Sequence, residues 1–236
     1  MTSPTVYFTG TGTLLLFSLG VAKYLKEHYT WDDSRVLTVS GGGIPAVALL
    51  TLPPTQFDVV ARRIAEQFSQ PTGGLGRLLK AGEYYQTALK YVVQKDTIHF
   101  LRDKLLIKTT QVPCIKHLVY NGPYNTVDEV VGKLSASAYI PVVFFMRLPW
   151  PDHLLEVDGA FGISNWIKEP WEDTLVVGPS YSGNEDVWYQ PNDWLRKIRP
   201  LSYFEHMSLY YAGYKKAQEQ YEVIELKLGE RRKRTE

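Results

Sequence analysis

Three short stretches of the sequence combine reactive groups with glycines. Ser40 follows the β-branched run 35–39 and precedes Gly41, Gly42 and an apolar stretch that can form a helix. A serine in a tight strand-to-helix turn exposes its hydroxyl above a helix N-terminus, where backbone N–H groups favour negative charge. The stretch predicts a nucleophile, although Thr38 replaces the first glycine of the Gly-x-Ser-x-Gly pattern. The alternative for this stretch alone is a glycine-rich turn that happens to contain a serine.

The other two stretches supply the groups that a serine nucleophile needs. Gly10-Thr11-Gly12 follows a strand-like segment and opens a helix, so its N–H groups can bind an oxyanion. Asp158 ends another strand-like segment and is the candidate general base. Because chemistry in α/β sheets collects at the carboxyl ends of strands, we expect these loops to meet Ser40. Such an arrangement suits acyl transfer.

The elements that must position these residues alternate along the chain between strand-like and helix-like patterns. This alternation predicts an α/β fold with a mainly parallel sheet and helices on both faces, in one domain over residues 1–228 followed by a basic tail, 229–236. Capping boxes are expected at Thr55 and Ser202, and Thr126 is expected to cap a third helix. The expected strands are 5–9, 35–39, 115–121, 154–158 and 174–177, and the expected helices are 14–28, 44–52, 57–68, 78–106 in one or two pieces, 126–139 and 202–221.

The composition limits the function classes. Of 236 residues, 44% are hydrophobic and 22% charged, as in globular proteins with a real core, and the net charge of +1 gives no reason to expect a nucleic-acid partner. The single cysteine, Cys114, reads as a buried structural thiol and fits a reducing compartment. We expect no signal peptide and no membrane-spanning helix, because the apolar run 14–17 is too short for a signal core and no run approaches about 18 apolar residues. We therefore expect an intracellular, cytoplasmic protein, with no metal site because the ligand spacings are lacking.

Several segments, in order, resemble the patatin-like phospholipase family. The stretch from Phe8 to Val21 is similar to its oxyanion segment, and Val39-Ser40-Gly41-Gly42 to its nucleophile elbow. Residues 135–141 resemble a helix end of the family, and Val157-Asp158-Gly159-Ala160 the segment with the dyad aspartate. Segments 177–183 and 211–217 resemble the adipose triglyceride lipase and adiponutrin branch. The resemblance spans residues 5 to 217.

The resemblance implies a three-layer α/β/α sandwich and a Ser-Asp dyad that needs no cofactor. Ser40 would attack an ester carbonyl of a phospholipid or acylglycerol, and Asp158 would accept its proton and later activate water. The N–H groups of Gly10-Thr11-Gly12 would form the oxyanion hole, and Thr38, Gly41 and Gly42 would shape the elbow. Such substrates imply transient contact with a membrane or lipid-droplet surface. No oligomeric state is implied.

Two alternatives to this hydrolase stay open. Thr38, Thr11 and Leu15 stand where the family has glycine, and a β-branched residue such as Thr11 tolerates a positive φ poorly. These replacements favour a catalytically weak protein that binds lipid. A Ser-His-Asp esterase is the other alternative, with His153 or His206 as the base.

Two further features bear on lipid contact. Tryptophans crowd the C-terminal half, where they serve either as core residues or as a lipid-interface patch. The tail Glu230-Arg231-Arg232-Lys233-Arg234 is explained either by solubility or by attraction to anionic lipid. The tryptophans in question are Trp150, Trp166, Trp171, Trp188 and Trp194.

Overall fold

The computed structural model describes residues 5–70, 74–111, 116–139, 156–159, 173–179, 185–189 and 201–229. The strands are β1 Val6–Phe8, β2 Val36–Val39, β3 Leu105–Gln111, β4 Lys116–Tyr120, β5 Glu156–Asp158, β6 Leu175–Pro179 and β7 Val187–Tyr189. The helices are α1 Leu15–His28, α2 Gly43–Thr51, α3 Phe57–Phe68, α4 Gly74–Val92, α5 Ile98–Leu101, α6 Val127–Ser137, α7 Tyr203–Glu219 and α8 Tyr221–Leu228. Short 3-10 turns lie at η1 Gly12–Leu14, η2 Ser40–Gly42, η3 Pro54–Gln56 and η4 Lys95–Thr97.

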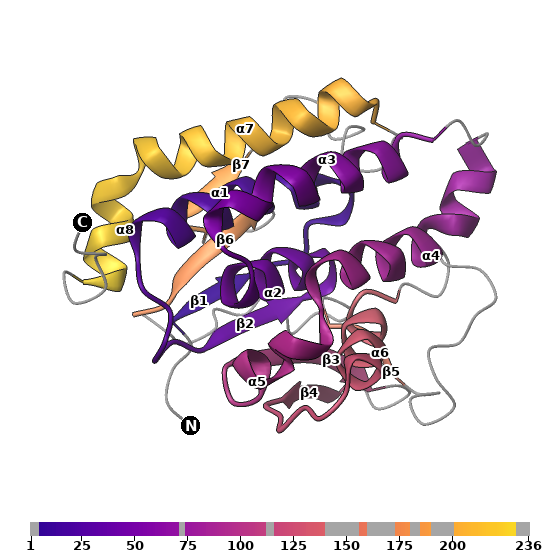
Figure 1. Cartoon of the computed structure of the whole chain (residues 1–236), viewed down its shortest axis with the longest axis horizontal. Helices are drawn as coiled ribbons and strands as arrows, with labels where there is room; N and C mark the ends of the chain where they lie inside the picture. The colour runs from indigo at the N-terminus through magenta and orange to yellow at the C-terminus, as the bar shows by residue number, and fades with distance from the viewer. Residues whose placement is uncertain are drawn as a thin grey trace.

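The strands form one mostly parallel sheet in the order β4-β3-β2-β1-β6-β7, with β5 paired to β3 (Figure 1). Strand β1 lies between β2 and β6, and all the pairs from β3 to β7 along this order are parallel. Strands β4 and β5 are both antiparallel to β3. The fold is therefore mixed α/β, with a central, mostly parallel sheet flanked by helices, as the sequence predicts.

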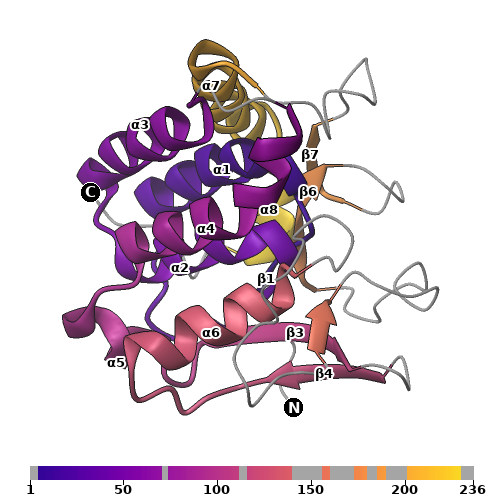
Figure 2. The same ribbon diagram turned by 90° about the vertical axis from the view of Figure 1, so that its right-hand side faces the viewer.

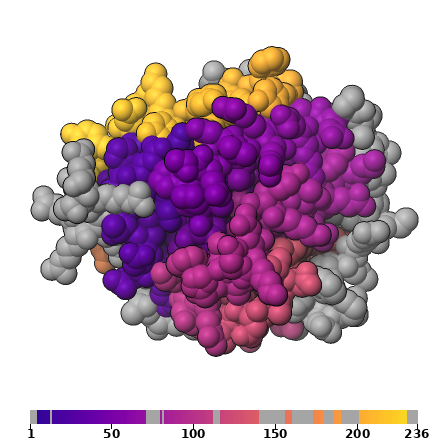
Figure 3. All heavy atoms as spheres, in the orientation of Figure 1, coloured from indigo at the N-terminus to yellow at the C-terminus, as the bar shows by residue number. Residues whose placement is uncertain are grey.

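Helices α1, α2, α3, α4 and α7 lie on one side of this sheet (Figure 2). The helices α3 and α4 cover the face seen in Figure 3, and α7 runs along its upper edge. The predicted apolar face of α3 is confirmed, because Phe57, Val60, Ala61, Ile64 and Ala65 are all buried. Burial of that stripe against neighbouring helices is the main source of stability for such an element.

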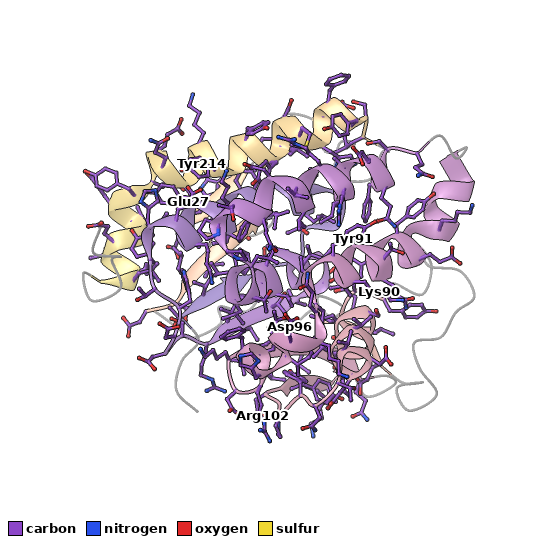
Figure 4. All side chains as sticks on the ribbon, in the orientation of Figure 1. Glu27, Lys90, Tyr91, Asp96, Arg102 and Tyr214 are labelled. Atoms are coloured by element: carbon purple, nitrogen blue, oxygen red, sulfur yellow. The ribbon has the colours of Figure 1, made fainter. Side chains whose placement is uncertain are left out.

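Helices α1 and α7 approach each other so closely that glycines are needed where their backbones meet. A Cβ on Gly20 would lie 1.9 Å from the Tyr210 carbonyl oxygen, and one on Gly213 would lie 1.9 Å from the Phe17 carbonyl oxygen. Polar side chains tie the same two helices together, since the Tyr214 hydroxyl donates to Glu27 Oε2 at 2.7 Å (Figure 4). The α1–α7 pair therefore fixes α7, which lies late in the chain, on the first helix of the fold.

The main error of the sequence prediction concerns β3. The segment 78–106 was expected to be helical, but α4 ends at Val92, α5 ends at Leu101, and Leu105 already belongs to β3. Residues Leu105 to Thr110 are all buried. Because β3 is buried on both faces, apolar and polar residues do not alternate along it: the apolar residues 105–107 are followed by the polar residues 108–111. The period of two that identifies a half-buried strand is therefore lacking.

Smaller corrections concern β7 and the helix termini. Strand β7 was not predicted, and the helix expected over 202–221 is divided at Gln220 into α7 and α8. The capping box at Ser202 and the Thr126 cap are confirmed, since each side-chain hydroxyl accepts an N–H of the first helical turn. The box at Thr55 is wrong, because Thr55 lies inside η3 and not at the position that caps α3.

Several sequence features lie outside the described residues: Cys114, the apolar run 142–146, His153, four of the five tryptophans in the C-terminal half, and the basic tail beyond Gly229. The fifth tryptophan, Trp188, lies in β7 and is partly buried, with Lys216 Nζ 5.8 Å from its ring. None of the helices within the described ranges has the length and apolar character needed to cross a bilayer.

Candidate active site

Strands β2 and β5 end head to head along the same edge of β3. The parallel pairing of β2 with β3 ends where Val39 lies opposite Lys108. The antiparallel pairing of β5 with β3 ends at the next position, where Asp158 lies opposite Thr109. Because the two strands run toward each other, the residue after Val39 must meet Asp158.

That residue is Ser40, and its hydroxyl contacts the carboxylate directly. Ser40 Oγ donates a hydrogen bond to Asp158 Oδ2 at 2.5 Å, although 118 positions separate the two residues. Both residues are buried, with Asp158 only 3% exposed. A short bond of this kind to a carboxylate is strong and lowers the cost of removing the hydroxyl proton. The structure thus brings together the predicted nucleophile and the predicted base.

The Ser40 backbone adopts a left-handed conformation, with φ 55°. Such a conformation costs an L-residue roughly 1–2 kcal/mol, so the surroundings must hold it. Its N–H donates to Ser137 Oγ at 3.0 Å, and Ser137 Oγ in turn donates to the Lys108 carbonyl at 2.6 Å. Its carbonyl accepts the Tyr85 hydroxyl at 2.9 Å and the N–H of Gly43.

The elbow glycines are required by close approach. A Cβ on Gly41 would lie 2.4 Å from Thr11 Oγ1, and a Cβ on Gly42 would lie 2.5 Å from the Phe8 carbonyl oxygen. Thr38 is fully buried within β2, opposite Phe8 on one side and Ile107 on the other. Thr38 therefore belongs to the strand and does not enter the turn.

The predicted oxyanion loop lies directly against this elbow. Thr11 is fully buried, and the N of Gly12 is 3.3 Å from where a Gly41 Cβ would be. Thr11 has φ −108°, whereas the positive φ of the loop, 50°, falls on Gly12. The replacement at Thr11 therefore brings no left-handed strain, and Leu15 is simply the buried first residue of α1. Gly10 immediately precedes Thr11 and is partly exposed.

Two backbone bonds fix the end of β5. The N–H of Asp158 donates to the Tyr139 carbonyl at 2.7 Å, and that of Gly159 to the Ser137 carbonyl at 3.1 Å. A Cβ on Gly159 would lie 2.3 Å from the Lys108 carbonyl oxygen, so only glycine fits there. The C-terminal end of α6 therefore holds Asp158 as well as the Ser40 N–H.

Sequence reasoning missed Tyr85 and the contact made by Ser137. Tyr85 lies on α4, and burial together with the negative charge of Asp158 raises the pKa of its phenol. Its position in an apolar helical pattern resembles that of any core tyrosine. Ser137 lies within the segment 135–141 that resembles the family, but nothing in that segment indicates that its hydroxyl reaches Ser40.

The described histidine candidate lies on α7. His206 is buried there, with its ring 6.1 Å from the ring of Phe68. A Ser-His-Asp arrangement places an imidazole between the serine and the carboxylate. Here the hydroxyl of Ser40 bonds to Asp158 itself. Among the described residues, no group of three histidine, cysteine or acidic side chains is arranged to hold a metal ion.

Comparison with known proteins relates the chain to patatin-like phospholipases. It is 25% identical over 190 residues to human "Patatin-like phospholipase domain-containing protein 2", with 77% of this chain and 36% of the human protein aligned. The proteins of the same name from Bos taurus and Mus musculus are 23% and 24% identical over the same length. No family model matches the chain.

These matches support a patatin-like family. They suggest, at the level of that family, a hydrolase acting on lipid esters. The fold described above is consistent with a patatin-like α/β/α fold. The aligned region spans little more than a third of the length of the curated relatives.

Proposed function

We propose that the chain is a serine acyl hydrolase that cleaves fatty-acyl esters of phospholipids or acylglycerols with a Ser40–Asp158 dyad. The observation that carries this proposal is the 2.5 Å hydrogen bond from Ser40 Oγ to Asp158 Oδ2. The proposal includes the adipose triglyceride lipase and adiponutrin-like branch, and transient contact of a cytoplasmic protein with a membrane or lipid-droplet surface. The names of the relatives support lipid esters as the substrate class.

In the first half-reaction, Ser40 Oγ attacks the ester carbonyl carbon while Asp158 accepts the hydroxyl proton. The negative charge that develops on the carbonyl oxygen is stabilised by N–H groups of Gly10, Thr11 and Gly12. Collapse of the tetrahedral intermediate breaks the ester C–O bond, and the departing alcohol takes the proton from Asp158. The product that stays on the protein is an acyl ester of Ser40.

In the second half-reaction, water attacks the acyl carbon while Asp158 accepts one of its protons. A second tetrahedral oxyanion is held by the same N–H groups. Its collapse releases the fatty acid and returns the proton to Ser40 Oγ. Each turnover therefore consumes one water and one ester, and Asp158 alternates between base and acid.

Ester hydrolysis and labelling by a fluorophosphonate serine probe test this mechanism. Ser40→Ala should abolish both, and Asp158→Asn should lower kcat at least about 10³-fold, because loss of a nucleophile or its base has effects of this size. Ser208→Ala, an exposed serine on α7, is the matched control and should keep wild-type activity.

Three outcomes would contradict the proposal. Activity that survives in Ser40→Ala would exclude Ser40 as the nucleophile. A wild-type protein that neither labels nor hydrolyses esters would favour the lipid-binding alternative. Loss of activity in His206→Gln with activity retained in Asp158→Asn would favour a triad.

A further inference from the structure

Two side chains from helices outside the two loops of the proposed site reach Ser40: Ser137 of α6 accepts its N–H, and Tyr85 of α4 donates to its carbonyl. We propose that Tyr85 is a positioning residue, whose phenol holds the Ser40 carbonyl so that the serine keeps the conformation in which Oγ meets Asp158. This role rests on the proposed function of Ser40. It adds α4 to the elements on which the reaction depends.

The contact is a buried hydrogen bond of ordinary length. The Tyr85 hydroxyl donates to the Ser40 carbonyl at 2.9 Å, and the tyrosine is only 6% exposed. Bonds to backbone groups in such surroundings are shielded from competition with water. The phenol therefore fixes the direction of the Ser40 carbonyl.

Gly43 leaves the space that this phenol occupies. A Cβ on Gly43 would lie 2.6 Å from Tyr85 Oη, although the φ of −60° at Gly43 suits any residue. Glycine is therefore needed at position 43 because of the limited space and not because of the backbone conformation. A side chain at position 43 would collide with Tyr85 and also with Leu134, whose Cδ2 would lie 2.8 Å from the added Cβ.

Ser40 needs this support because its backbone is left-handed and carries a side chain. Four hydrogen bonds hold it: the N–H donates to Ser137, the carbonyl accepts from Tyr85 and from the Gly43 N–H, and Oγ donates to Asp158. Rotation of the backbone toward the right-handed region would turn the carbonyl and move Oγ. Without Tyr85, the Ser40 carbonyl keeps the Gly43 N–H as a partner but loses the bond that links it to α4.

The surroundings of Tyr85 favour the protonated phenol, which is the form that donates to the Ser40 carbonyl. Burial, and then the negative charge of Asp158, raise the pKa of Tyr85. The hydroxyl therefore keeps its proton when Asp158 is ionised, which is the state in which Asp158 acts as a base.

Tyr85→Phe tests the proposal, with Tyr124→Phe as the matched control. Tyr124 is also buried and also donates to backbone carbonyls, those of Leu105 and Tyr120, both at 3.2 Å. Tyr85→Phe should lower kcat and the fluorophosphonate labelling rate about tenfold, with KM unchanged. Tyr124→Phe should stay within about twofold of wild type after a comparable change in Tm. Equal rates for Tyr85→Phe and wild type would overturn the proposal, as would equal losses in the two variants.

Amide hydrogen exchange separates this proposal from the proposed function. A peptide that includes Ser40 should exchange faster in Tyr85→Phe than in Tyr124→Phe, whether or not the protein hydrolyses esters. Unchanged exchange in Tyr85→Phe would overturn the positioning role even in an inactive protein. A wild-type protein that does not label, together with faster exchange in Tyr85→Phe, would contradict only the hydrolase.

Discussion

At the residue scale, the site depends on how closely two loops approach. Thr11 Oγ1 lies 2.4 Å from the point that a Gly41 Cβ would occupy. Among the described residues this hydroxyl makes no hydrogen bond, although it is buried. A buried hydroxyl without a partner costs stability, and what this one does in the structure is to fill the space between the two loops.

Gly41→Ala should therefore lower kcat for ester hydrolysis at least about tenfold by pushing the oxyanion loop away, since misplacement by about 1 Å can cost 10²-fold. The added methyl would collide with Thr11, so Thr11→Gly in the same chain should restore part of the loss. Thr11→Gly alone is the control for the effect of the second change. Additive losses in the double variant would show that the two loops do not constrain each other.

At the element scale, β3 is the strand on which the site is assembled. It holds β2 and β5 end to end, and Glu156 of β5 lies on the same face of the sheet as Asp158. The Tyr120 hydroxyl donates to Glu156, and Lys133 Nζ lies 4.0 Å from Glu156 Oε1 and 3.7 Å from the centre of the Tyr120 ring. This cluster ties β5 to β4 and α6, and so opposes a slip in register that would turn Asp158 away.

Lys133→Met should lower the free energy of unfolding by about 2 kcal/mol, because it removes a cation from beside a buried carboxylate. This is less than for a fully buried pair, since the lysine side chain is 13% exposed. The control is Lys215→Met, whose partner Glu219 is exposed, and its effect should stay within about 0.5 kcal/mol. Denaturant titration of both variants measures the loss of unfolding free energy. Equal losses in Lys133→Met and Lys215→Met would show that Lys133 does not anchor β5.

At the scale of the whole molecule, a polar cluster joins the three helices α1, α3 and α7. Lys23 Nζ of α1 lies 2.9 Å from Asp58 Oδ1 of α3, and the Tyr210 hydroxyl of α7 donates to the same oxygen at 2.7 Å. Burial by itself would raise the pKa of Asp58, but the bonds from Lys23 and Tyr210 and the charges of Lys23 and Arg62 hold it below its ordinary value. The ionised carboxylate therefore favours the folded state.

The sign of the pH effect follows from this lowered pKa. The contribution of Asp58 to stability is present above the ordinary aspartate pKa, about 3.9, and is lost as the pH falls through the lower pKa of the folded state. The Tm of Asp58→Asn should therefore fall less than the Tm of wild type when the pH is lowered from about 5 to about 3. Asp33→Asn, an exposed aspartate in the turn before β2, should keep the wild-type profile. The same profile for Asp58→Asn would contradict the role of this cluster.

Sequence reasoning found the groups with local signatures and missed those that depend on long-range packing. Ser40 and Asp158 stand next to glycines at strand ends, where the local pattern is informative. Strand β3 was missed because it is buried on both faces, and Tyr85 because a buried tyrosine on a helix looks the same whether it fills space or holds a carbonyl. The head-to-head meeting of β2 and β5 is a property of pairing register, and no single segment of sequence encodes it.

The meeting of β2 and β5 on β3 also governs the order in which the site can appear during synthesis. The serine, its elbow and β3 leave the ribosome well before Asp158, which lies 118 residues after Ser40. A nascent chain that has folded only as far as β3 thus holds a serine without its carboxylate. Hydrolysis by the proposed dyad requires β5 to have paired with β3. The moment at which activity appears would therefore report when this part of the sheet has folded.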